Sequence, residues 1–200
     1  RERGWEPLLI VRKGDAALAQ LESDGFYALP VDLSGLPRRP GLAVFPFLWK
    51  LAASLRLMSR TLKSFRPDLV LGMGGYLSFP LAYAAWRRGV PRAVHESNAI
   101  LGLANKASAA LGSQVFWGLP PQDGAQTVVG TPIRPALWKR RDPAEARRAL
   151  GLDLERPTML VFGGSQGAQG LNENLPRALK DLALPALQVL HLAGRGKSAN

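Results

Sequence analysis

Short runs of leucine and β-branched residues recur along the chain, and amphipathic segments separate them. This alternation is the sequence form of repeated βα units, in which helices join parallel strands. We therefore predict an α/β fold, with strands at residues 7–11, 68–72, 92–95, 114–116, 127–129, 158–162 and 186–191. A long helix is expected at 42–64, and shorter helices are expected to begin near residues 78, 102, 142 and 168. The core-facing stripe expected on the long helix is Leu48, Leu51, Leu55, Met58 and Leu62.

Residues 130–135 follow a predicted strand and contain two prolines, which are typical of a chain leaving a domain. We place the domain boundary near Arg134, with one domain at residues 1–134 and a second at 135–200. The chain opens as though an earlier strand were missing, and it stops after one βαβ unit. The first domain is therefore expected to be nearly complete and the second only begun.

The composition excludes several kinds of chemistry. The chain has no cysteine and two histidines, which leaves no disulfide, no thiolate zinc site and no multi-histidine metal site. No metal or other cofactor is expected. The longest apolar run, residues 41–49, contains Pro46 and is about half of the roughly 20 residues that a membrane-spanning helix needs. We expect neither an export signal nor a membrane span.

The formal net charge of +11 suits nucleic acid, an anionic membrane surface or a phosphate-rich substrate. The excess is regional, because residues 38–106 hold eleven Lys or Arg against two acids. No basic stretch interleaved with aromatics and no nucleic-acid-binding motif is present, so nucleic acid is the least favoured partner.

The long predicted helix has a second stripe, which begins with Phe45 and Trp49 and continues as Arg56, Arg60 and Lys63. Aromatic residues followed by cations suit the headgroup region of an anionic membrane. We predict membrane docking through this stripe, extended by Arg38, Arg39, Arg87 and Arg88. The alternative is a solvated basic face whose aromatics pack under a neighbouring loop.

Two glycine-rich loops each follow a predicted strand and precede a helix. The first holds Gly74, Gly75 and Tyr76, and the second, residues 163–167, adds the hydroxyl of Ser165. Such loops let backbone N–H groups approach an anion at a helix N-terminus. The alternatives are tight turns without a ligand and, for Ser165, a helix cap. Two such loops together indicate a phosphate-bearing ligand.

Polar residues end a third predicted strand, at the edge where catalytic groups gather. His95 beside Glu96 can perform proton transfer, although neighbours on a strand point to opposite faces and His95 can equally be structural. Arg134 can pair with a phosphate or a uracil carbonyl, or it can form a surface ion pair.

These motifs, in this order and spacing, resemble the MurG family of glycosyltransferases. The matching positions are residues 71–76, 80, 89–91, 95–98, 102, 105–106, 129–134, 163–168 and 172. The family often has Asn where this chain has Thr131. Its chains are longer at both ends, with an earlier strand and glycine loop and most of a second domain, so the 200 residues alone are expected to be inactive.

The resemblance implies a GT-B fold, in which an acceptor-binding and a donor-binding Rossmann-like domain face each other. Asn98, Arg134 and Ser165 match positions associated with the sugar nucleotide. His95 and Glu96 match cleft positions as well, and as the catalytic candidates they are expected to position or deprotonate the acceptor. The other matching cleft positions are Gly74, Gly75, Tyr76, Asn105 and Asn172.

The implied reaction is an inverting transfer of N-acetylglucosamine from UDP to the muramoyl 4-hydroxyl of lipid I, an undecaprenyl-diphosphate-linked sugar, giving lipid II. The implied location is peripheral, at the cytoplasmic face of the bacterial plasma membrane. The rival interpretation is a non-catalytic module that binds a nucleotide sugar or a lipid diphosphate, because glycine loops explain binding without chemistry.

Overall fold

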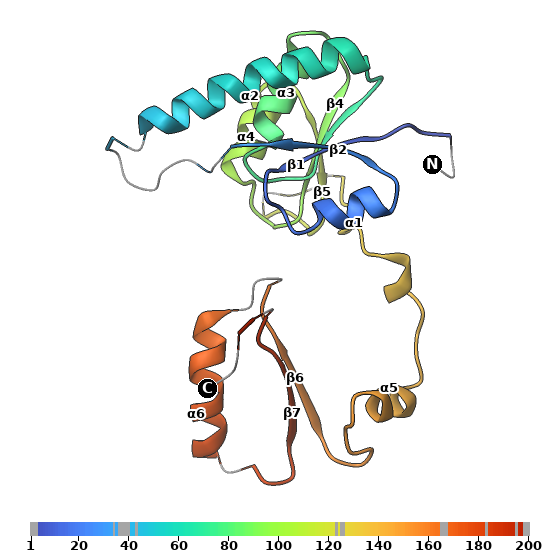
Figure 1. The fold of residues 1–200 in the computed structure, drawn as a ribbon. Helices are drawn as coiled ribbons and strands as arrows, with labels where there is room; N and C mark the ends of the chain where they lie inside the picture. The colour runs from blue at the N-terminus through green and yellow to red at the C-terminus, as the bar shows by residue number, and fades with distance from the viewer. Residues whose placement is uncertain are drawn as a thin grey trace. The chain divides into compact units, whose positions relative to one another are not determined.

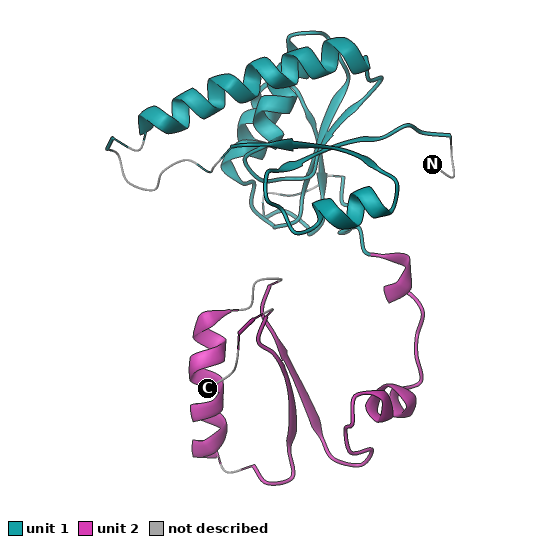
Figure 2. Cartoon of the chain, viewed as in Figure 1, with its two compact units in different colours: residues 1–133 teal, residues 134–200 magenta. Residues whose placement is uncertain are grey.

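A computed structural model describes residues 4–33, 35, 41–42, 44–122, 124, 127–164, 168–182, 184–194 and 196–197. The chain divides into two compact units, residues 1–133 and 134–200 (Figure 2). Every strand pairing is parallel, and helices connect the strands, so the predicted α/β class is confirmed.

The first unit carries two parallel sheets (Figure 1). Its elements are β1 (Leu8–Arg12), α1 (Leu18–Ser23), β2 (Tyr27–Val31), α2 (Val44–Phe65), β3 (Val70–Gly72), α3 (Ser78–Trp86), β4 (Arg92–Glu96), α4 (Leu103–Ala110) and β5 (Gln114–Trp117). β1 pairs with β2, and the second sheet has the order β3-β4-β5. Within the described residues, β1 and β3 each have one strand partner, so each sheet ends on an open edge.

Two local features differ from the sequence pattern. The pattern does not predict β2, because Pro30 interrupts its apolar run, yet Pro30 pairs with Val11. Proline lacks an N–H and is tolerated at sheet edges, and β2 pairs with β1 alone. The strand expected at 127–129 is wrong: only a bridge between Val128 and Trp117 forms there.

The core of the first unit joins both sheets to α2 and α3. Its buried members are Val31, Leu33, Met58, Leu62, Val70, Ala84 and Ala85. The predicted stripe of α2 is right for Met58 and Leu62, which are buried, and Leu51 packs against the cluster. Leu48 is instead 51% exposed, because the buried positions of α2 begin only at Ser54.

The second unit is a βαβ unit preceded by a short connecting segment. Its elements are the 3₁₀ turn η1 (Pro135–Leu137), α5 (Pro143–Ala149), β6 (Thr158–Phe162), α6 (Gln169–Leu182) and β7 (Gln188–Leu192). The helix α6 connects β6 to β7, which pair in parallel over five residue pairs. Asp142 caps α5 by accepting the N–H of Ala144 at 3.3 Å.

The contrast within α2 gives a stability prediction. Met58→Ala should lower the free energy of unfolding by about 2–5 kcal/mol, because Met58 is 1% exposed and its removal leaves a cavity. Leu48→Ala on the same helix should cost under about 1 kcal/mol. Urea unfolding followed by circular dichroism measures both, and equal losses would contradict this account of the core.

Candidate functional site

A cleft of about 620 Å³ lies at the carboxyl ends of β3 and β4. Because parallel strands end at the same sheet edge, the loops that follow them meet there. Six of the predicted site residues line this cleft: Gly74, Gly75, Tyr76, Glu96, Asn98 and Asn105. The structure therefore brings the first glycine loop and the loop after β4 together in one place.

The loop between β3 and α3 is shaped to present backbone N–H groups. Gly74 and Gly75 have φ of +87° and +74°, a conformation that side chains with a Cβ rarely adopt. Ser78 Oγ donates to the Gly74 carbonyl at 2.8 Å and closes the turn. The N–H groups of Gly74, Gly75 and Tyr76 donate to no other described residue. Together with the N-terminus of α3, they can bind an anion.

Glu96 is 4% exposed, and four hydrogen bonds hold its carboxylate. Oε1 accepts the backbone N–H of Asn98 at 3.0 Å and its side-chain amide at 2.9 Å. Oε2 accepts the N–H of Gly102 and the amide of Asn105, both at 2.9 Å. This carboxylate clamp therefore fixes the loop of residues 97–102 and its junction with α4.

The clamp favours the ionised carboxylate. Burial raises the pKa of Glu96, but the hydrogen bonds from the Gly102 and Asn98 backbone and from the Asn105 and Asn98 side chains outweigh it. The pKa of Glu96 is consequently held below its ordinary value. A carboxylate with a lowered pKa and occupied oxygens is a weak proton acceptor.

His95 is also buried, and it is not among the residues that line the cleft. Its Nε2 lies 2.9 Å from the Gly130 carbonyl, to which a protonated Nε2 donates, and its Nδ1 lies 3.5 Å from Ser97 Oγ. The imidazole thereby ties the end of β4 to the segment that leads out of the first unit. This contact matches the structural alternative for His95.

The segment around Thr131 passes very close to β5. A Cβ on Gly118 would lie 2.6 Å from Thr131 Oγ1 and 3.1 Å from Ser97 Cα. The Gly118 N–H donates to the Glu96 carbonyl at 2.7 Å. Gly118, at the end of β5, is therefore in close contact with both the loop after β4 and the segment around Thr131.

The remaining site residues expected from sequence lie in the second unit. Arg134 is exposed at the start of η1, and Gly163 follows β6. Asn172 is 6% exposed on α6 and donates to the Ala193 carbonyl at 2.9 Å, while its Oδ1 has no partner among the described residues. Ser165 lies outside the described residues.

Sequence reasoning missed the apolar wall of the cleft. Its members are Leu33, Phe47, Leu51, Phe79 and Leu103. The sequence pattern did single out Leu51, since it belongs to the apolar stripe of α2. The whole stripe, however, is expected from the pattern to face the core and not a cleft. Phe47 lies four residues before Leu51, on the same helical face, and that spacing could have indicated the wall.

Among the described residues, no group of three or more His, Cys, Asp or Glu side chains could hold a metal ion. Among the helices described in Figure 1, none combines the length and the hydropathy of a membrane span.

Comparisons with known proteins agree with the two-unit organisation. Residues 2–117 match the glycosyltransferase family 28 N-terminal domain, and residues 158–200 match the glycosyltransferase family 28 C-terminal domain. The first match covers more than half of the chain. The chain therefore belongs to glycosyltransferase family 28, whose members transfer sugars.

Curated relatives identify a smaller family within glycosyltransferase family 28. A Nocardioides protein is 44% identical over 82% of this chain, and one from Elusimicrobium minutum is 35% identical over 97%. Both are named UDP-N-acetylglucosamine–N-acetylmuramyl-(pentapeptide) pyrophosphoryl-undecaprenol N-acetylglucosamine transferase. Within family 28, the chain is a member of the MurG family. It spans about half the length of these relatives, 46% and 55%.

Solved structures support the GT-B fold class. The crystal structure of Acinetobacter baumannii MurG superposes with a TM-score of 0.66 and is 26% identical in sequence. The match covers 98% of this chain and 54% of the other chain. The Streptomyces glycosyltransferase SsfS6 is 17% identical with a TM-score of 0.51, over 96% of this chain and 60% of that one, and this likeness concerns the fold alone.

The clamp gives a pH prediction. Because the folded-state pKa of Glu96 is lowered, its stabilisation is present above the unfolded pKa of about 4.3 and is lost as the pH falls through the folded value. At pH 7, Glu96→Gln should cost about 2–3 kcal/mol, since all four donors lose a charged acceptor and two of them then face an NH2 group. Urea unfolding from pH 7 to pH 3 should show this cost shrinking with acid. A cost that is independent of pH would contradict an ionised clamp.

Proposed function

We propose that these residues belong to an enzyme that transfers N-acetylglucosamine from UDP-N-acetylglucosamine to lipid I, with inversion at the anomeric carbon, to give lipid II for peptidoglycan synthesis. The names of the relatives supply the reaction. The cleft supplies the physical support, because unpaired N–H groups lie beside an apolar wall in it.

The two sides of the cleft suit a lipid-linked diphosphate acceptor. The N–H groups of Gly74, Gly75 and Tyr76 can hold diphosphate oxygens at the N-terminus of α3. Phe47 and Phe79, in the apolar part of the lining, can cover the first apolar atoms of the prenyl chain. Asn105, which the Glu96 clamp holds, also lines the cleft. The first unit is thus proposed as the acceptor-binding domain.

The donor is proposed to bind through the second unit. Arg134 is exposed, and no carboxylate of the described residues lies within 4.0 Å of its guanidinium, which leaves the group available for a phosphate or a uracil carbonyl. Ser165 would contact the diphosphate, and Asn172 on α6 is proposed as a further cleft residue of the second unit. Asn98, at the rim of the cleft in the first unit, would reach the sugar. Amide dipoles and helix N-termini can stabilise departing UDP without a metal ion.

His95 and Glu96 are proposed to act in this reaction by positioning. Glu96 holds Asn98 through two hydrogen bonds, and His95 holds Gly130. Turnover should fall in variants of either residue while donor affinity changes little. The group that removes the acceptor hydroxyl proton is then to be sought outside this pair.

Transfer by the natural polypeptide that contains these residues tests the reaction. Radiolabelled N-acetylglucosamine should pass from UDP to a lipid I analogue. Arg134→Ala should weaken donor binding by about 10- to 150-fold, the loss of one desolvated charge-assisted contact, and Ser165→Ala should weaken it less. Arg140→Ala, a nearby exposed arginine, is the control. Donor binding without turnover would favour the non-catalytic module, and unchanged affinity in Arg134→Ala would remove Arg134 from the site.

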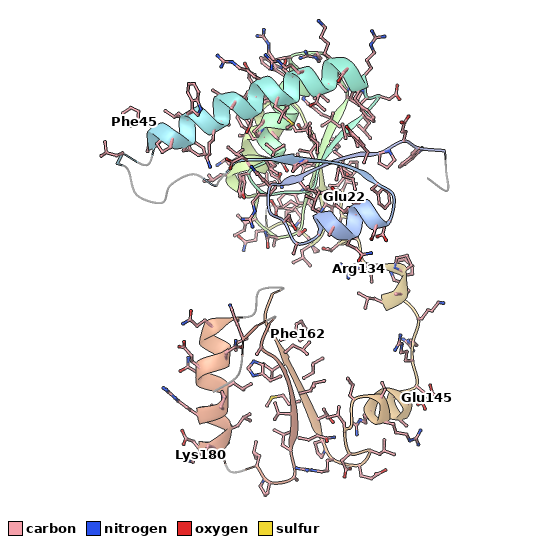
Figure 3. All side chains as sticks on the ribbon, in the orientation of Figure 1. Glu22, Phe45, Arg134, Glu145, Phe162 and Lys180 are labelled. Carbon is pink, nitrogen blue, oxygen red and sulfur yellow. The ribbon has the colours of Figure 1, made fainter. Side chains whose placement is uncertain are left out.

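The enzyme is further proposed to dock peripherally on the cytoplasmic face of the plasma membrane, where lipid I is collected for cell-wall synthesis. Phe45 is 70% exposed and Trp49 is 75% exposed on α2, which supports docking through these rings. Figure 3 labels Phe45 near the start of this helix. Arg56 and Arg60 follow on the same helix and are exposed. Aromatic rings at headgroup depth beside cations would hold the protein on anionic lipid.

Vesicle co-sedimentation of the 200-residue chain tests the docking. Binding should require anionic lipid and weaken with salt. Phe45→Ser with Trp49→Ser should reduce it strongly, whereas Tyr27→Ser, which removes an equally exposed aromatic from β2, should not. Equal binding to neutral vesicles, or no binding at low salt, would refute the docking proposal.

A further inference from the structure

Ser97 connects the buried imidazole of His95 to the cleft. It follows the end of β4, is exposed and lines the cleft. Its Oγ lies 3.5 Å from His95 Nδ1, and no other described residue bonds this hydroxyl. The backbone of Ser97 is closely packed, because a Cβ on Gly118 would lie 3.1 Å from Ser97 Cα. The hydroxyl is therefore held beside the imidazole at the wall of the cleft.

The hydrogen-bond partners of His95 determine the orientation of the Ser97 hydroxyl. The Gly130 carbonyl, 2.9 Å from Nε2, can only accept, so Nε2 carries the ring proton. A neutral imidazole has one such proton, and its Nδ1 is then an acceptor. The Ser97 hydroxyl consequently donates to Nδ1. Because its hydrogen is used in this way, the Ser97 oxygen can only accept a hydrogen bond from a molecule in the cleft.

The amide side chain of Asn98 is oriented in the same sense. Its nitrogen donates to Glu96 Oε1 at 2.9 Å. Since a carboxylate oxygen can only accept, the amide nitrogen must face Glu96, and the amide oxygen Oδ1 is the atom left for other partners. Asn98 is exposed and lines the cleft. It therefore offers a ligand an oxygen acceptor, as Ser97 does.

The cleft thus has two parts of opposite hydrogen-bonding character. The glycine loop of Gly74, Gly75 and Tyr76 offers N–H donors, which suit an anion. Ser97 and Asn98 offer oxygen acceptors, and the ionised Glu96 carboxylate that bonds Asn98 disfavours a second negative charge beside them. A diphosphate fits the first part, whereas a group that carries hydroxyls, such as a sugar, fits the second.

We propose that Ser97 Oγ accepts a hydrogen bond from a hydroxyl of the acceptor sugar, and that His95 is the residue that positions the Ser97 hydroxyl for this contact. This inference rests on the proposed acceptor function of the first unit and makes it specific. The diphosphate of lipid I would bind at the glycine loop, and its muramoyl sugar would lie beside Ser97. The reacting 4-hydroxyl and the 6-hydroxyl are the same kind of donor, so the experiment has to separate them.

Steady-state kinetics of the natural polypeptide with a lipid I analogue test the contact. Ser97→Ala should lower kcat/KM for the analogue about 2- to 10-fold, the loss of one neutral hydrogen bond, and leave the KM for UDP-N-acetylglucosamine unchanged. Ser97→Thr keeps the hydroxyl and should restore kcat/KM. Ser23→Ala, which removes an exposed serine from α1, is the control. With a 6-deoxy analogue, the effect of Ser97→Ala should vanish if the 6-hydroxyl is the partner and persist if the 4-hydroxyl is.

The orientation of the Ser97 hydroxyl can be tested without turnover. The chain has two histidines, so nitrogen NMR spectra of the 200-residue chain, isotope-labelled at histidine, can be assigned with His191→Gln. His95 should carry its proton on Nε2. Ser97→Ala should shift the Nδ1 resonance of His95 while Nε2 stays protonated. A neutral His95 with its proton on Nδ1 would overturn the inference, whatever the kinetics show.

The kinetic outcomes separate this inference from the proposed reaction. Absence of transfer by the unaltered polypeptide would refute the reaction itself. Transfer with an unchanged kcat/KM in Ser97→Ala would refute the role of Ser97 alone. Equal losses for the lipid I analogue and for UDP-N-acetylglucosamine would also overturn that role, because they would indicate a distorted loop and not a lost contact with the acceptor.

Discussion

The cleft of this protein depends on one buried carboxylate. Glu96 collects two backbone N–H groups and two side-chain amides, and its own carbonyl accepts the N–H of Gly118. These bonds join β4, the following loop, α4 and the end of β5. An ionised group in such a place is costly unless every lone-pair direction is used. Four donors meet that requirement, and the same four hydrogen bonds hold the loop after β4 in its conformation.

The two loops at the sheet edge differ in how their polar groups are bonded. The N–H groups of the glycine loop after β3 have no hydrogen-bond partner among the described residues, whereas the polar groups of the loop after β4 bond to Glu96. The first loop is therefore suited to binding an anion and the second to rigidity. Asn98, held at the cleft rim, is the point where the rigid loop is exposed. Under the proposed function, preorganised dipoles, and not mobile side chains, would receive the diphosphate.

Sequence reasoning was accurate where a local pattern had a single physical meaning. The parallel strands, the glycine turns and the meeting of the loops after β3 and β4 all follow from βα alternation. It failed where tertiary context decided the outcome. Pro30 is acceptable because β2 is an edge strand, which the local pattern did not reveal. The saturation of Glu96 could not be foreseen, because its partners at Gly102 and Asn105 depend on the path of the loop.

The open edges of β1 and β3 have a consequence for the chain in solution. Each offers a row of backbone donors and acceptors that no described strand uses, and Leu71 on β3 is 48% exposed beside one of them. The outer edge of β2 carries Pro30, which blocks pairing, but β1 and β3 contain no proline. At high concentration such open edges are places where one copy of the chain can pair with another. Self-association of the isolated 200 residues would therefore arise by pairing between strand edges.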